Sequence, residues 1–196
     1  TIIYMFISEL YLKNENPVNS WAYTMLGQMY IVLPFSLINV LAFQQVGPGQ
    51  ITFDFLLPLS IFIFLWTNDT GAYVCGSLFG KHKLFPRISP KKSWEGSIGG
   101  GILVLIVAGI IGYFANNSGT PHVLSIPAWV GLGLVVIFFG TWGDLVESLL
   151  KRTLGVKDSG NILPGHGGML DRFDSSLLAI PAAVVYLYTL TFWIQH

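Results

Sequence analysis

The sequence predicts an all-α, polytopic transmembrane helix bundle, and three observations support this fold class. Of the 196 residues, 53% are hydrophobic and only 10% are charged, whereas an average soluble domain is about a quarter charged. The mean hydropathy is high, at +0.63. Apolar runs long enough to cross the hydrocarbon core of a bilayer recur along the chain. This hydrophobicity predicts a lipid bilayer as partner. The net charge is zero, so the charge balance predicts no nucleic-acid partner.

The apolar runs place about six spans in a single integral membrane domain that covers residues 1–196. The first span, 1–12, is partial, because the chain opens inside an apolar run and we expect it to be N-terminally truncated. The later runs are long enough for complete spans and occupy 20–44, 51–80, 96–115, 127–150 and 175–195. The motifs that carry chemistry lie within 67–176, which we expect to be the catalytic part.

The run 51–80 is too long for one straight span. About 30 helical residues reach roughly 45 Å, and the hydrocarbon core is only about 30 Å thick. The polar stretch "TNDTGAY" at 67–73 interrupts this run. We therefore expect a broken or strongly tilted helix near 67–80. Irregular backbone at membrane depth is tolerated only beside protein or a water-filled cavity, so 67–73 is a candidate cavity wall.

The basic residues fall in three places that alternating spans put on one side of the membrane. They are Lys13, then Lys81, Lys83, Arg87, Lys91 and Lys92, and then Lys151, Arg152, Lys157 and Arg172. The connections 45–50 and 116–126 contain neither lysine nor arginine. Short loops rich in Lys and Arg stay in the cytoplasm, so we expect the basic side to face it.

Carboxylates gather toward the cytoplasmic ends of these spans. Ionisable groups inside a membrane span are costly and are usually functional. Asp144 and Glu147 are three residues apart and therefore neighbours on one helix face. Asp171 and Asp174 repeat this spacing before the last span, and Asp69 lies in the polar interruption.

Three interpretations of these carboxylates remain open. In the structural one, Asp174 caps the last helix and Asp144 pairs with Arg152 or Arg172. In the second, the carboxylates bind a hard divalent cation such as Mg²⁺, which prefers oxygen ligands and completes its shell with water and phosphates. In the third, Asp69 and Asp144 relay protons or sodium in an ion-coupled transporter.

Cations and small residues surround the acidic positions in the segment "SLLKRTLGVKDSGNILPGHGG". Lys151, Arg152, Lys157 and His166 suit anionic ligands, and glycines at 165, 167 and 168 let backbone approach a ligand closely. The start of the following helix favours phosphate. In the loop 89–96, "SPKKSWEG", Lys91 and Lys92 are further phosphate candidates, although cytoplasmic loops are basic in any case. Together these features indicate phosphoryl or nucleotidyl transfer.

From Ser148 onward the spacing is that of a known signature. The chain continues with Lys151-Arg152, Lys157-Asp158, Gly160, Pro164, His166-Gly167-Gly168 and Asp171-Arg172-Phe173-Asp174. This pattern resembles the signature of the phosphatidate cytidylyltransferases, also called CDP-diacylglycerol synthases. The segments "NDTGAY" and "SPKKSWEG" also resemble family segments in the same order.

The resemblance implies a Mg²⁺-dependent nucleotidyltransferase. Such an enzyme transfers a cytidylyl group from CTP to phosphatidic acid and releases pyrophosphate. By motif match, Asp144, Asp171 and Asp174 hold the metal centre, which in the family also takes K⁺. Catalytic contacts to phosphates come from Lys151, Arg152, Lys157, His166 and Arg172. Substrate contacts come from Asp69, Lys91, Lys92, Ser93, Ser148, Gly167 and Gly168. The resemblance also implies a homodimer in a bacterial-type inner membrane.

Two rival functions fit the same sequence. A CTP-dependent kinase of the polyprenol or phytol type shares the nucleotide, the metal and the membrane setting, but it releases CDP instead of pyrophosphate. An ion-coupled transporter that uses Asp69 and Asp144 belongs to a different class of protein and does not consume CTP.

Overall fold

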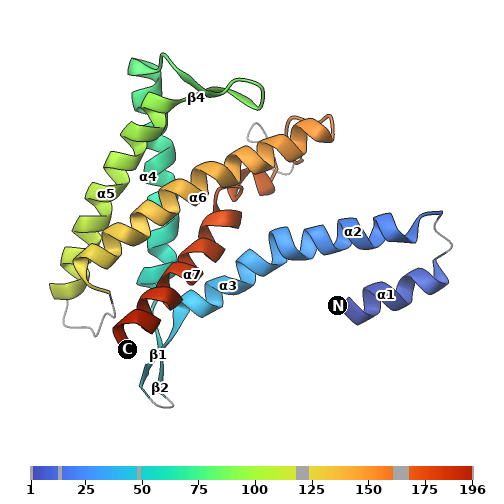
Figure 1. Cartoon of the computed structure of the whole chain (residues 1–196), viewed down its shortest axis with the longest axis horizontal. Coiled ribbons are helices and arrows are strands. Elements are labelled where there is room, and N and C mark those ends of the chain that lie inside the picture. Colours follow the sequence, from blue (N-terminus) through green and yellow to red (C-terminus); the bar gives the residue numbers. More distant parts are fainter. Residues whose placement is uncertain (1, 13–14, 48–49, 118–123, 161–167, 196) are drawn as a thin grey trace.

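The computed structural model describes residues 2–12, 15–47, 50–117, 124–160 and 168–195 as a helix bundle with two short β-hairpins (Figure 1). In chain order the elements are α1 (Ile2–Tyr11), α2 (Pro17–Gly27), η1 (Gln28–Val32), α3 (Leu33–Ala42), β1 (Phe43–Gly47), β2 (Gln50–Phe53), α4 (Leu56–Phe79), β3 (Lys83–Phe85), β4 (Ser89–Ser93), α5 (Trp94–Asn117), α6 (Ile126–Thr153), η2 (Leu170–Arg172) and α7 (Ser176–Gln195). The predicted all-α class is confirmed, because the strands within these described ranges form only two two-stranded hairpins, β1–β2 and β3–β4.

Three helical runs in the described part of the chain are long and apolar enough to cross a membrane. They are Pro17–Ala42, Trp94–Asn117 and Ile126–Thr153, and a shorter apolar helix spans Ser176–Leu190. α4 has 24 residues, but its second half carries polar side chains, and α1 has only ten residues. The protein is therefore an integral membrane protein, and the predicted number of about six spans stays a prediction.

The predicted break near residues 67–80 is wrong, because α4 is one continuous helix. It runs from Leu56 to Phe79, and the amide of Gly80 closes its last turn on the carbonyl of Gly76 at 3.0 Å. The helix also begins later than the predicted span, since residues 50–53 form a strand that pairs antiparallel with β1. Of the two alternatives offered for this span, only the tilted helix remains a prediction.

Close packing against α5 explains why the polar stretch stays helical. A Cβ built on Gly100 of α5 lies 2.5 Å from the carbonyl oxygen of Asn68 and 2.9 Å from the backbone nitrogen of Ala72. A Cβ on Gly96, one turn earlier, lies 2.7 Å from the carbonyl oxygen of Ala72. Small residues four apart let membrane helices approach this closely. The polar end of α4 is thereby held against β4 and the start of α5.

Replacing Gly100 by alanine is expected to destabilise the bundle by about 1–3 kcal/mol, the usual cost of overpacking. The added methyl group meets backbone atoms of α4, which cannot rotate away. Thermal unfolding in detergent measures the effect. Gly109→Ala is the matched control, because a Cβ at this position of the same helix meets nothing within 4 Å. Equal melting temperatures for the two variants would contradict the packing argument.

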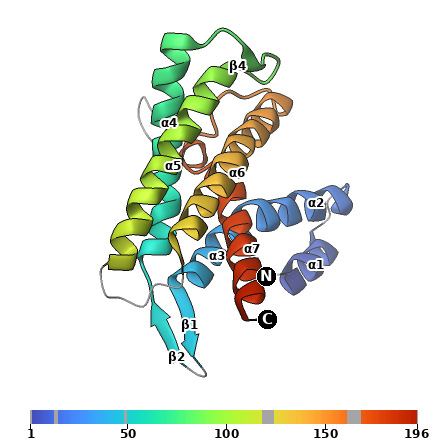
Figure 2. The same cartoon turned by 60° about the vertical axis from the view of Figure 1, so that its left-hand side comes forward.

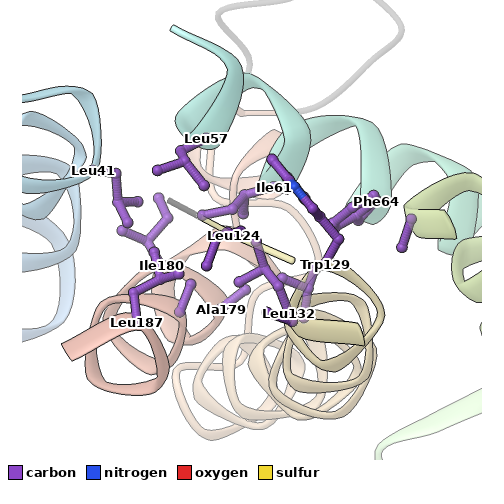
Figure 3. Close-up of a cluster of buried hydrophobic side chains, with 14 of the residues drawn as sticks. Leu41, Leu57, Ile61, Phe64, Leu124, Trp129, Leu132, Ala179, Ile180 and Leu187 are labelled. Carbon is purple, nitrogen blue, oxygen red and sulfur yellow. The ribbon is translucent and has the colours of Figure 1, made fainter. Parts of the chain in front are cut away.

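The apolar core joins α3, α4, α5, α6 and α7 beneath the polar end of the bundle (Figure 3). Leu41, Ile61 and Ile180 come from three of these helices, and the fully buried ring of Trp129 comes from α6. In contrast, α1 and α2 extend away from this core in both views (Figures 1 and 2), and α2 contains no buried residue. The core therefore fixes α4, α6 and α7, the helices whose ends carry the predicted site.

Candidate active site

A pocket of about 280 Å³ opens where α4, β4, α5 and α6 meet. Its lining consists of Asn68, Asp69, Ala72, Tyr73, Lys91, Lys92, Ser93, Gly96, Ser97, Thr141 and Asp144. The structure thus brings together five residues that the sequence analysis placed in the site from separate segments. They are Asp69, Lys91, Lys92, Ser93 and Asp144. Asn68, Ser97 and Thr141 are polar lining residues that the sequence analysis did not single out, although Asn68 lies in the polar stretch 67–73.

Asp144 is held by two neighbours at the mouth of this pocket. The ammonium group of Lys92 forms an ion pair with Asp144 Oδ2, and both side chains are about a quarter exposed, at 26% and 24%. Ser148, one turn further along α6, donates a hydrogen bond to Oδ1 at 3.2 Å. β4 thus brings Lys92 to Asp144, a partner that the structural interpretation did not name, and the pairing of Asp144 with Arg152 or Arg172 stays a prediction.

A second cluster forms around Lys151 near the end of α6. The Lys151 ammonium lies 2.5 Å from Glu147 Oε2 and 2.7 Å from Asp171 Oδ1. Glu147 is fully buried, and its Oε1 has no hydrogen-bond partner among the described residues. Glu147 is not among the predicted site residues, although a four-residue spacing to a lysine on one helix indicates such an ion pair.

Asp171 is a fixed anion that joins α6 to the segment after it. Its Oδ2 accepts hydrogen bonds from the amide and hydroxyl of Ser159, both at 2.9 Å, and from the amide of Gly168 at 2.7 Å. Partial burial favours its protonated form, but these bonds and Lys151 outweigh burial and hold the pKa of the Asp171 carboxyl well below its usual range. The predicted site residues His166 and Gly167 lie outside the described residues.

The backbone of Asp174 packs against α6 at Gly143, the residue that precedes Asp144. A Cβ built on Gly143 would be 3.0 Å from the Asp174 carbonyl oxygen, so the glycine permits this approach. The Asp174 Oδ1 accepts a hydrogen bond from the amide of Ser175 at 2.6 Å. Burial, followed by the negative charge of Asp144, raises the pKa of the Asp174 carboxyl to about 7. Negative charge is thus concentrated between α6 and the start of α7.

The first turn of α7 bears on the alternative role of Asp174 as a helix cap. The amide of Ser176 bonds to the carbonyl of Phe173 at 2.9 Å, and the amide of Leu177 to the carbonyl of Asp174 at 3.3 Å. The Asp174 carboxylate instead accepts from Ser175, which precedes the helix. Backbone carbonyls therefore satisfy these helical donors without the Asp174 side chain.

The carboxylates of the site suit a hard divalent cation in chemistry but do not form a complete metal site. Asp69, Asp144 and Asp174 offer oxygen ligands of the type Mg²⁺ prefers, and Asp144 acts electrostatically on both of the others. The described residues nevertheless contain no group of three acidic, histidine or cysteine side chains positioned to hold a metal. Asp171 is engaged by Lys151 and two amides. The predicted metal set of Asp144, Asp171 and Asp174 therefore stays a prediction.

Three other basic residues of the predicted site are described by the structure, and all three are exposed. Arg152 and Lys157 lie at and beyond the end of α6, and Arg172 lies in η2. None of these three lines the pocket, whereas Lys91 and Lys92 do. The structure therefore divides the predicted cations into two pocket lysines, the ion-paired Lys151 and an exposed group beside it.

Fold and site together define an integral membrane protein with a pocket of mixed charge at one end of its helices. Residues 1–190 match the cytidylyltransferase family, and the chain belongs to this family. A phosphatidate cytidylyltransferase of Staphylococcus aureus (strain COL) is 49% identical over 129 residues, which cover 66% of this chain and 48% of that protein.

A second relative comes from a different bacterial lineage. The phosphatidate cytidylyltransferase of Haemophilus influenzae is 48% identical over 127 residues, covering 65% of this chain and 43% of that protein. The matched region thus spans about half the length of these curated relatives.

Proposed function

We propose that this protein is a nucleotidyltransferase that moves a cytidylyl group from CTP to phosphatidic acid in phospholipid biosynthesis. The products are CDP-diacylglycerol and pyrophosphate. One observation carries the proposal: the pocket joins Lys91 and Lys92 to the carboxylates of Asp69 and Asp144 at the polar end of the helices. Cations for phosphate beside oxygen ligands for Mg²⁺ are the requirements of phosphoryl-group transfer. The names of the two bacterial relatives support the same reaction.

The reaction needs charge stabilisation more than it needs a base. An oxygen of the lipid phosphate, already anionic, attacks the α-phosphorus of CTP. The bond from this phosphorus to the bridging oxygen breaks, and the electron pair leaves with pyrophosphate. Lys91 and Lys92 in the pocket offset the triphosphate charge, and Ser93 offers a hydroxyl beside them. Asp144, Asp171 and Asp174 would hold Mg²⁺, with K⁺ as a second cation, and the metal would supply electrostatic stabilisation of charge on the phosphates.

The cluster around Lys151 supplies a further positioned charge. Because Glu147 and Asp171 hold its ammonium from two sides, Lys151 needs little reorganisation when charge develops on phosphate oxygens. In the proposed enzyme, Arg152, Lys157, His166 and Arg172 extend this cationic surface. The small residues Gly167 and Gly168 let the phosphates approach, and Ser148 orients Asp144.

We place the site at the cytoplasmic face of a bacterial inner membrane. The basic β3–β4 hairpin and the C-terminal end of α6 lie at one end of the bundle, opposite the β1–β2 hairpin (Figures 1 and 2). Loops rich in Lys and Arg favour the cytoplasmic side, where soluble CTP is available.

A homodimer is also part of the proposal, and light scattering of the detergent-solubilised protein tests it.

An assay with CTP, phosphatidate and Mg²⁺ in detergent tests the proposed reaction. We expect CDP-diacylglycerol and pyrophosphate, and we expect EDTA to remove the activity. Release of CDP with a phosphorylated polyprenol would instead identify the lipid kinase. Ion flux into proteoliposomes without CTP turnover would identify the transporter. A folded preparation that forms no product from CTP and phosphatidate would also contradict the proposal.

A further inference from the structure

Tyr30 carries a buried hydroxyl that the proposed mechanism does not use. It lies in η1, the π-helical segment between α2 and α3. Its oxygen is buried and has no hydrogen-bond partner among the described residues. A buried hydroxyl without a partner costs free energy, and each such group in a native structure calls for an explanation. One explanation is a ligand that supplies the missing partner when it binds.

The sequence explains why the helix departs from α geometry at this point. Pro34 has no amide hydrogen, and a proline ring collides with the carbonyl four residues earlier, which is that of Tyr30. The helix widens, and the amide of Leu33 bonds to the carbonyl of Gln28, five residues back. Single π turns of this kind are frequent at functional sites. Pro34 therefore sets the backbone position from which the Tyr30 side chain projects.

The Tyr30 hydroxyl lies within electrostatic range of the charged residues of the candidate site. Four side chains from α6 and the start of α7 act on it electrostatically, and they are Glu147, Asp174, Asp144 and Lys151. An aromatic contact holds the helix in this place, since Phe35 meets Phe173 edge to face with ring centroids 5.6 Å apart. Phe173 directly precedes Asp174. The helical run that carries Tyr30 is thus packed against the residue before Asp174, one of the carboxylates proposed for the metal.

Tyr30 belongs to a different side of the site than the pocket does. The lining of the pocket comes from α4, β4, α5 and α6, whereas Tyr30 belongs to the helical run 17–42. This run exposes large apolar side chains around η1, among them Tyr23, Leu26 and Met29. Its length and composition suit a membrane span, so these side chains face lipid. The two sides of the site therefore differ, with lysines at the pocket and a tyrosine on the side of the lipid.

We infer that Tyr30 donates a hydrogen bond to the phosphate of the lipid substrate. This inference rests on the proposed function, in which that phosphate must approach Asp144 and Asp174. Among carboxylates a tyrosine hydroxyl acts as a donor, and an anionic phosphate oxygen is an acceptor that gains from a charged hydrogen bond. The nucleotide occupies the pocket, so Tyr30 contributes to recognition of the lipid and not of CTP.

Steady-state kinetics of Tyr30→Phe with each substrate varied in turn test this role. We expect kcat/KM for phosphatidate to fall about tenfold, the value of one hydrogen bond to a charged group. The KM for CTP and the Mg²⁺ concentration for half-maximal activity should change less than about twofold. Tyr23→Phe is the matched control, because Tyr23 is 69% exposed on the same helical run and its hydroxyl should not matter.

Each outcome of this experiment is decisive. Unchanged kinetics in Tyr30→Phe overturn the inference, and so does an equal loss for both substrates. A shift confined to the Mg²⁺ requirement overturns it too, since the hydroxyl would then support the metal carboxylates and not the lipid. A wild-type protein that is folded but makes no CDP-diacylglycerol removes the proposed function itself, which distinguishes that failure from failure of this inference.

Discussion

Replacing Asp174 by asparagine is expected to abolish cytidylyl transfer, with a loss in kcat/KM of at least about 10³-fold, or roughly 4 kcal/mol of transition-state stabilisation. Asparagine keeps the size of the side chain and an oxygen that can accept from the amide of Ser175. It removes only the negative charge that the proposed mechanism requires beside Asp144. The loss therefore reports on charge at this position and not on packing.

The stability of Asp174→Asn gives a second, independent readout. The pKa of the Asp174 carboxyl is raised to about 7, above its value in an unfolded chain. Ionisation of this carboxyl then opposes folding, and the cost appears as pH rises from about 4 through 7. At pH 8 without Mg²⁺, the variant should melt no lower than wild type although it is inactive. Glu15→Gln, an exposed acid before α2, is the control for activity. Wild-type turnover in Asp174→Asn would remove Asp174 from the proposed set of metal ligands.

The parts of this molecule that were predictable from sequence are those set by local composition. The spans expected at 96–115 and 127–150 correspond to α5 and α6 within three residues at each end, because apolar runs with polar ends determine them. Carboxylates inside such runs are costly, so Asp69 and Asp144 stood out as site residues, and both line the pocket.

Features that depend on which helices pack together were not predictable in this way. The continuity of α4 depends on the approach of Gly96 and Gly100 from α5, and nothing local to residues 67–73 shows that partner. The pairing of Asp144 with Lys92 depends in the same way on where the β3–β4 hairpin folds. Local polarity indicated the residues of the site, and tertiary packing chose their partners.

Replacing Lys151 by methionine is expected to be the most destabilising change at the site, costing about 3–5 kcal/mol, as when one partner of a buried ion pair is removed. Glu147 is fully buried, and the Lys151 ammonium 2.5 Å away is the cation that compensates its charge. Methionine has a similar length but leaves Glu147 without compensation. Arg152→Met, at the exposed neighbouring position, is the matched control and should change the unfolding free energy by less than about 0.5 kcal/mol.

The double variant Glu147→Gln with Lys151→Met separates stability from activity. Removing both charges leaves no ion at the fully buried position 147, so most of the stability lost there should return, as expected for paired buried charges. Asp171 keeps its hydrogen bonds from Ser159 and Gly168. Activity should stay low, because the positioned cation proposed to meet phosphate is still missing. Chemical or thermal unfolding of the four proteins forms a double-mutant cycle, and the coupling free energy should be about 1–3 kcal/mol. A cycle with no coupling would show that Glu147 and Lys151 do not depend on each other. The buried ion pair would then have no part in holding the site.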